Sequence, residues 1–209
     1  MGTYATLLTD VPAFLDNDSA ELANNLPTII QNAQDMLFRD LTVAELFGTY
    51  SGSLTQSSIS FPRPSDILTL RGVTILTSSG LTSLNYRDRG YMEQFWPNQA
   101  QTAIPIYFGV LNEGTFMTAP TPDSSYFYTV QYKKRLAYLS ASNSSNWLSN
   151  NCYDVLLAAC CLVGSQFVID DRQAGLIAVY GARYKEGITL INAQQGPYQK
   201  DDFNAAAKG

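Results

Sequence analysis

The chain has 209 residues and a mass of 23.0 kDa, which is enough for one domain or two small domains with a buried core. Apolar residues make up 45% and charged residues only 15%, with a mean hydropathy of −0.08, a balance that excludes both a disordered chain and a membrane-spanning one. The sequence contains no His, which removes the Ser–His–Asp and Cys–His nucleophile pairs and the commonest ligand of transition metals.

Residues 1–45 have the pattern of helices. Asp10 is expected to cap a short helical turn at Val11-Pro12, and Ser19 is expected to cap a second short piece. Asn25 precedes Leu26-Pro27, which indicates the start of a longer helix. Its apolar residues recur at helical spacing on one face, namely Leu26, Ile29, Ile30, Ala33, Leu37 and Leu41, while Gln31, Gln34 and Asp35 fall on the other face.

Residues 46–146 are rich in Thr, Ser, Tyr, Phe, Gly and Pro, which predicts short strands and turns. Alternating patterns at 58–61 and 67–76 indicate two strands. The sharpest hairpin signal is formed by residues 107–111 and 115–118 around Asn112-Glu113-Gly114. A further strand is predicted from Tyr126 to Lys134, with Tyr128, Val130 and Tyr132 on one face, and one helical turn over 91–96.

Residues 147–195 return to a helical pattern. Asn146 or Ser149 is expected to cap the first helix, whose apolar stripe is Val155, Leu156, Ala159, Leu162, Val163 and Phe167. After a break at Asp170-Asp171, a second helix carries Ile177, Tyr180, Tyr184, Ile188 and Ile191 at intervals of three or four. Three glycines would cost that helix about 1 kcal/mol each relative to Ala, so we expect neighbouring elements to hold it.

The three cysteines predict a reducing compartment. Within one helix, Cys152 and Cys160 would lie about 12 Å apart, beyond the roughly 7 Å that a disulfide tolerates between Cα atoms. Adjacent Cys160 and Cys161 point to different faces. We therefore expect reduced, buried cysteines, as in a reducing cytosol.

Charge is distributed unevenly along the chain. Residues 1–45 hold seven acids and one base, whereas residues 46–146 hold five acids and seven bases. A free nucleic-acid-binding protein usually has a basic stripe and a high pI, but the pI here is about 4.6. We therefore expect no sequence-specific DNA binding, although DNA can pass an acidic wall that repels phosphate.

The sequence offers no convincing catalytic, cofactor or metal site, so we do not expect an enzyme. Ser51 lacks the surrounding Gly-x-Ser-x-Gly motif. Asp170-Asp171-Arg172 is typical of a cap between helices with a surface ion pair. The loop Arg87-Asp88-Arg89-Gly90 has compensated charge, and Arg87, Arg89 and Arg172 are the candidates for contacts between subunits.

The order of these pieces predicts an α+β fold. We expect a helical bundle, made of the N-terminal helices (1–45) and the C-terminal helix pair (147–195), with an inserted antiparallel β region (46–146) and an extended tail (196–209).

Several segments of the chain form an ordered set of motifs. The first is Tyr4 through Leu15, followed by the pattern Leu26-Pro27-x-x-Ile30-x-x-Ala33-Gln34. Next come Phe61-Pro62-x-Pro64, Pro105-x-Tyr107-Phe108 and Pro120-x-Pro122, and then Leu139-Ser140, Asn143 and Ser145-Asn146-Trp147-Leu148 before the closing helices. In this order they resemble the opening helices, strand entry, hairpin and closing helices of the head-to-tail adaptor (connector) proteins of tailed bacteriophages, especially short-tailed phages. The resemblance covers about 190 residues.

The resemblance implies a structural virion protein without enzymatic activity, assembled in the host cytoplasm. Such proteins form a ring of twelve subunits beneath the portal protein, extend the DNA channel, and give the tail nozzle or tail fibre proteins a docking place. The acidic N-terminal residues could line or rim that channel. Tyr198, Lys200 and Phe203 in the tail would then contact the portal, no membrane would be involved, and DNA would pass without sequence-specific binding.

Other functions fit parts of the pattern. The aromatic β region would suit a carbohydrate-binding tail module, and a tail terminator is a related ring component of the same particle. A two-carboxylate glycoside hydrolase would need an acid and a base about 5–10 Å apart, and no spacing in the sequence indicates such a pair.

Overall fold

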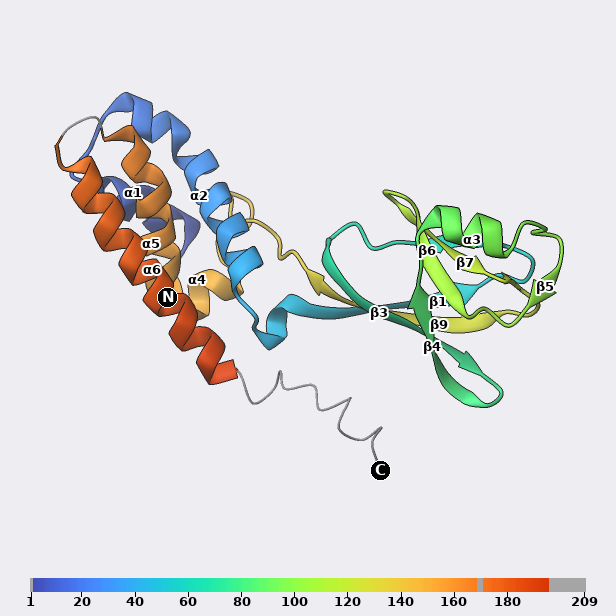
Figure 1. Cartoon of the computed structure of the whole chain (residues 1–209). Helices are drawn as coiled ribbons and strands as arrows, with labels where there is room; N and C mark the ends of the chain where they lie inside the picture. Colours follow the sequence, from blue (N-terminus) through green and yellow to red (C-terminus); the bar gives the residue numbers. More distant parts are fainter. Residues whose placement is uncertain (1, 169–170, 196–209) are drawn as a thin grey trace. The chain divides into compact units, whose positions relative to one another are not determined.

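The computed structural model describes residues 2–168 and 171–195, which form a mixed α+β fold (Figure 1). The α+β class predicted from the sequence is confirmed. The chain divides into two compact units. The helical unit is drawn from Met1–Leu46 and Leu136–Gly209, and the β unit is Phe47–Arg135.

The helical unit contains five α-helices and two short 3-10 helices within the described ranges. They are α1 (Tyr4–Leu15), α2 (Ala20–Asp40), η1 (Ala44–Leu46), α4 (Trp147–Asn151), α5 (Tyr153–Gly164), η2 (Ser165–Phe167) and α6 (Gln173–Gln195). None of the described helices is both long enough and apolar enough to cross a bilayer.

Both N-terminal helices begin earlier than the sequence predicts. Thr3, and not Asp10, caps α1, through a capping box with Thr6. Ser19 does act as a cap, but it starts one continuous helix, because Pro27 lies inside α2. Pro27 and the residue four positions earlier, Ala23, are both exposed, so water can bond the carbonyl group that proline leaves without an N–H partner.

The polar face predicted for α2 is wrong at Gln34, which is fully buried. Its side-chain oxygen accepts hydrogen bonds from the backbone N–H of Leu139 at 2.9 Å and from Nδ2 of Asn146 at 3.0 Å. Its Nε2 donates to the carbonyl of Ile30 at 3.2 Å. A polar side chain inside α2 therefore holds the segment that returns from the β unit.

Helix α5 is buried almost all round rather than along one stripe. The buried residues run without a break from Val155 to Cys161. The reason is that α5 packs against α1, α2, α4 and α6, so little of its surface is free (Figure 1). Phe167 of the predicted stripe lies beyond the helix, in η2.

The stripe predicted for α6 is partly buried. Tyr180 and Tyr184 are buried, Ile188 and Ile191 are half-buried, and Ile177 is 42% exposed. Helix α6 packs on its own unit through the two tyrosines, and Asn192 bonds with Thr42 and Asp40, whereas Leu190, outside the stripe, is 57% exposed.

The β unit contains nine strands and one helix. They are β1 (Phe47–Leu54), β2 (Ser60–Pro62), β3 (Ile67–Thr77), β4 (Gly80–Tyr86), α3 (Arg89–Phe95), β5 (Thr102–Ala103), β6 (Tyr107–Asn112), β7 (Thr115–Ala119), β8 (Thr121–Pro122) and β9 (Tyr126–Lys134). Seven strands form one sheet in the order β1-β9-β3-β4-β6-β7-β2, and β5 pairs with β8.

The β region is not purely antiparallel, which corrects the sequence prediction. Strands β4 and β6 pair in parallel, as do β5 and β8. The crossover through α3 carries the chain back before β6 begins, which is the connection that a parallel pair requires. All other pairs in the described sheet are antiparallel.

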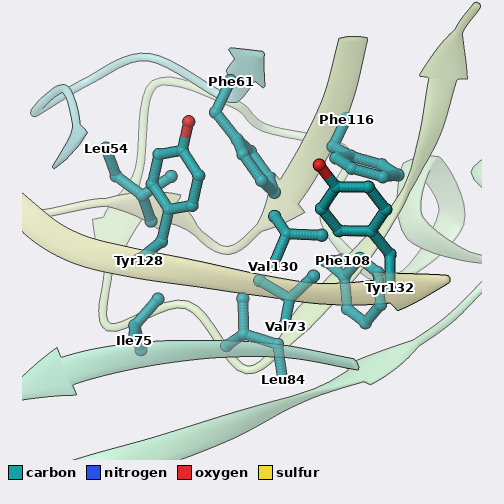
Figure 2. Packing of buried hydrophobic residues seen from close by; sticks show 10 residues of the cluster. All are labelled: Leu54, Phe61, Val73, Ile75, Leu84, Phe108, Phe116, Tyr128, Val130 and Tyr132. Atoms are coloured by element: carbon teal, nitrogen blue, oxygen red, sulfur yellow. The ribbon is translucent and has the colours of Figure 1, made fainter. Parts of the chain in front are cut away.

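Several predicted β elements are confirmed. The hairpin of β6 and β7 forms with a register shift between Val110 and Asn112, as expected for a bulged connection. The inward face of β9 consists of Tyr128, Val130 and Tyr132, all buried. They pack on Val73 and Ile75 of β3 and on aromatic side chains from β2, β6 and β7, which together form the core of the unit (Figure 2).

The three cysteines are free and buried, as the spacing argument predicts. Burial raises the pKa of the Cys152 and Cys161 thiols to about 12, and it raises the pKa of Cys160 as well. The thiols are therefore protonated and unreactive at neutral pH.

Candidate interaction surfaces

One exposed feature of the β unit is a group of aromatic rings around α3. We call it the aromatic cluster, and it consists of Arg87, Tyr91, Phe95, Trp96 and Tyr107. The side chain of Asp88 caps α3 by accepting a hydrogen bond from the N–H of Tyr91 at 2.9 Å. This cap fixes the start of α3, so that Tyr91 and Phe95, four residues apart, fall on the same face.

The rings contact one another closely. Those of Tyr91 and Phe95 stack with centroids 6.0 Å apart, and the ring of Phe95 meets that of Tyr107 edge-on at 4.9 Å. A hydrogen bond with Tyr91 is the main factor that raises the pKa of the Tyr107 hydroxyl, and burial adds to it. The rings therefore form one packed surface rather than separate side chains.

Arg87 joins the two tyrosines of this surface. Its guanidinium lies 5.3 Å from the ring centroid of Tyr91 and 5.6 Å from that of Tyr107, within the range of cation–π attraction. Its Nη1 also donates to the Tyr86 carbonyl at 3.1 Å. A flat platform for sugar stacking needs free ring faces, and here the guanidinium and neighbouring rings lie against them.

A small core supports the aromatic cluster from below. It contains Met92 of α3 together with Met117 and Ala119 of β7, all buried. Gly109 allows the close approach of this layer, because a Cβ there would lie 2.4 Å from the carbonyl oxygen of Arg87. The cluster is thus built on a fixed base.

The exposed fractions mark the cluster as a surface for contact. Tyr91 is 38% exposed and Phe95 is 41% exposed, although their rings contact each other. Aromatic residues and Arg are enriched at the centres of protein–protein interfaces, where they carry most of the binding energy. The arrangement suits contact with another protein.

A second apolar group lies on the outside of the sheet. Leu76 of β3 stands beside Leu81 of β4 and Phe127 of β9, and the three are 49%, 77% and 71% exposed. We call these three residues the outer row. They alternate along their strands with the buried residues of the core, so they point away from it.

Most N-terminal acids in the helical unit have partners within that unit. The hydroxyls of Tyr153, Tyr138 and Tyr184 each donate a hydrogen bond of 2.6 Å, to Asp10, Asp35 and Asp40 respectively. Burial, followed by the bond to Asp10, raises the pKa of Tyr153 to about 12, and the same two causes raise the pKa of Tyr184 through Asp40. These aspartates therefore tie α1 and α2 to later segments of the chain.

The candidate arginines are dispersed. Arg89 pairs with Glu93 through Nε and Oε1 at 2.6 Å, and Arg172 pairs with Asp16 through Nη1 and Oδ2 at 2.9 Å. Arg87 and Arg89 belong to the β unit and Arg172 to the helical unit. Tyr198, Lys200 and Phe203 lie outside the described residues, as does Asp170.

Phe95 and Tyr107 are not among the residues predicted to form a site, although the spacing of the aromatic residues gives a hint of one. The predicted turn over 91–96 places Tyr91 and Phe95 four residues apart, which puts two aromatic rings on one helical face. Their contact with Tyr107 depends on the crossover between β4 and β6, which no local pattern indicates. Across the described ranges, no group of Cys, Asp or Glu could hold a metal ion.

Comparison with known proteins identifies the family of the chain. A search of curated proteins gives no match. The family model described as SU10 adaptor protein matches residues 2–206, nearly the whole chain. The chain therefore belongs to the SU10 adaptor protein family, which confirms the resemblance to phage head-to-tail adaptors and identifies it as a phage structural protein.

Proposed function

We propose that this SU10-family adaptor forms a ring of twelve subunits that joins the portal protein to the tail and extends the DNA channel. Family membership supports the adaptor role. The exposed aromatic cluster is the observation that carries the proposal, because rings of Tyr, Phe and Trp held around Arg87 suit a stable contact between proteins. The ring would assemble in the host cytoplasm and remain in the neck of the virion.

The distribution of charge supports a contact in which unlike surfaces of neighbouring copies meet. The helical unit has 13 acids and 6 bases, and the β unit has 5 acids and 7 bases, which gives formal charges of −7 and +2. In the proposed ring, the aromatic cluster of one copy, with Arg87 and Arg89, contacts the acidic helical unit of the next. Opposite charges speed such an encounter and fix its register, and a contact between unlike surfaces gives a ring when the rotation between copies closes.

The helical unit of each copy would act as one folded body in this ring. We propose that its N-terminal helices and C-terminal helix pair act together as one helical bundle, since α5 packs against α1, α2 and α6. Arg172 bonds with Asp16 within this unit, so its part in subunit contact would be an exchange of partner on assembly.

Contact with the portal is assigned to the tail in this proposal. Tyr198 and Phe203 are aromatic anchors in a segment of otherwise small, polar and charged residues, and Lys200 supplies the positive charge between them. The tail nozzle or tail fibre proteins would dock elsewhere on the ring.

DNA would move through the channel without specific binding, and the chain would perform no catalysis. The net charge of −5 gives little attraction for phosphate, and the absence of His leaves no common nucleophile pair.

Co-sedimentation with portal rings of the same phage tests the function directly. We expect the purified full chain to sediment with those rings and not with rings of an unrelated phage. A chain that stays in the supernatant with its own portal, or that binds an array of glycans instead, would contradict the proposal.

A further inference from the structure

The helical unit contains an apolar groove of about 420 Å³ between α5 and α6. It is lined by Phe14 of α1, by residues of α5 between Tyr153 and Ala158, and by residues of α6 between Tyr180 and Leu190. Phe14 is 49% exposed and Leu190 is 57% exposed, so both ends of the groove present uncovered apolar surface. Three charged residues line it, namely Asp154 of α5 and Arg183 and Glu186 of α6.

The chain supplies a segment of matching length. Residues 196–209 follow the last described residue of α6, and the groove ends at Leu190, five positions before that residue. The α6 wall from Leu190 back to Tyr180 spans about 15 Å at ~1.5 Å per residue. Residues 198–203 span about 17 Å in an extended chain, in which Tyr198 and Lys200 point to the same side.

Gly196-Pro197 lies where the chain would have to reverse to run back along α6. Glycine and proline are the residues that favour tight turns. From such a turn, Tyr198 reaches the Leu190 end of the groove.

The charged residues of the tail and of α6 fit the same alignment. Lys200 is two positions beyond Tyr198, about 7 Å along an extended chain, and Glu186 is about 6 Å from Leu190 along the helix. Asp201 and Asp202 follow at about 10–13 Å, and Arg183 lies about 10 Å from Leu190. A reversed tail therefore places a cation near Glu186 and anions near Arg183.

We infer that residues 196–209 bind back along the α5–α6 groove of their own chain before assembly. Tyr198 fills the Leu190 end of the groove, and Lys200, on the same side of the extended tail, pairs with Glu186. These two residues, assigned above to the portal, are then covered in the free subunit, and docking requires their release. This inference does not depend on the portal contact, because it concerns the isolated chain.

Disulfide trapping in the full chain tests the inference. One variant carries Leu190→Cys with Gln199→Cys, and the matched control carries Thr189→Cys with Gln199→Cys. Thr189 is exposed but does not line the groove, and it is separated from residue 199 by nearly the same length of chain. The three native cysteines are buried, so they do not compete.

A freely moving tail would close both disulfides almost equally, because loop closure depends only weakly on loop length. We expect the Leu190 pair to close at least tenfold more readily than the Thr189 pair in a glutathione redox buffer, as an intrachain bond. Glu186→Lys should lower this preference, and adding Lys200→Glu should restore it. Equal closure of the two pairs, or a bond that forms only between chains, would overturn the inference.

Discussion

The side-chain oxygen of Gln34 in α2 lies 2.9 Å from the backbone nitrogen of Leu139, a residue 105 positions later in the chain. The same oxygen also binds Nδ2 of Asn146. One buried amide thus fixes both ends of the segment through which the chain re-enters the helical unit. Because this side chain is fully buried, water cannot replace the bonds that it makes.

Replacing Gln34 should therefore destabilise the helical unit. In Gln34→Met the side-chain volume is nearly kept, but the N–H of Leu139 and the amide of Asn146 lose their acceptor. We expect the free energy of unfolding to fall by about 1–3 kcal/mol, the cost of leaving a buried donor without a partner. Urea unfolding followed by circular dichroism measures it.

The control for this prediction is Gln31→Met, on the same helix and exposed. It should change the stability by less than about 0.5 kcal/mol. Equal effects of the two substitutions would show that the bonds made by Gln34 contribute nothing specific.

Replacing Gly187 and Gly181 of α6 by Ala should change the stability of the protein in opposite directions. A Cβ at position 187 would lie 2.4 Å from Cγ2 and 3.3 Å from Cβ of Val155, a stiff side chain that cannot turn away. Overpacking should cost about 1–3 kcal/mol, more than the ~1 kcal/mol gained in helix propensity. At position 181 the nearest atom, on Leu162, would be 3.9 Å away, so Gly181→Ala should stabilise the protein. Thermal melts of both variants decide the sign.

The raised pKa of Tyr153 predicts that the folded protein loses stability at high pH. Burial and its bond to Asp10 raise its pKa to about 12 in the folded chain, compared with about 10 when unfolded. A raised pKa means that the neutral hydroxyl stabilises the fold below pH 10, and that this contribution disappears as the pH rises through 12. Unfolding free energies measured from pH 9 to 12 should fall less steeply for Tyr153→Phe than for the wild type. Identical slopes would contradict this assignment.

The aromatic cluster should control association between subunits. Phe95→Ala and Arg87→Ala remove ring and guanidinium contacts at an exposed surface, so the monomer should stay folded while assembly on the portal weakens about tenfold or more. Phe127→Ala in the outer row, also on the β unit and 71% exposed, is the matched control and should assemble normally. Sedimentation velocity at several protein concentrations distinguishes the variants.

Local patterns in the sequence predict local structure well. The alternation of Tyr128, Val130 and Tyr132 correctly identifies the inner face of β9, and the Gly-containing connection correctly identifies the hairpin of β6 and β7. The sequence pattern places the start of α2 too late, because Pro27 is typical of a first helical turn. Leu22 continues the apolar stripe one turn earlier and is buried.

Features that depend on distant partners could not be read from the sequence. The burial of Gln34 requires Leu139 and Asn146 as partners, and its apolar neighbours Ile30 and Leu37 on α2 do not reveal them. The parallel pairing of β4 and β6, and with it the contact between Phe95 and Tyr107, arises from the path of the chain through α3. Arg87 was identified as a candidate, but its aromatic partners were not.

The number of copies bound to one portal ring tests the central claim most directly. Native mass spectrometry of the full chain, titrated onto portal rings of the same phage, gives that number. We predict saturation at twelve copies per ring, with few partly filled rings, because each copy completes the surface that binds the next. Copies that add singly without mutual contact, or a chain that never binds the portal, would contradict the account.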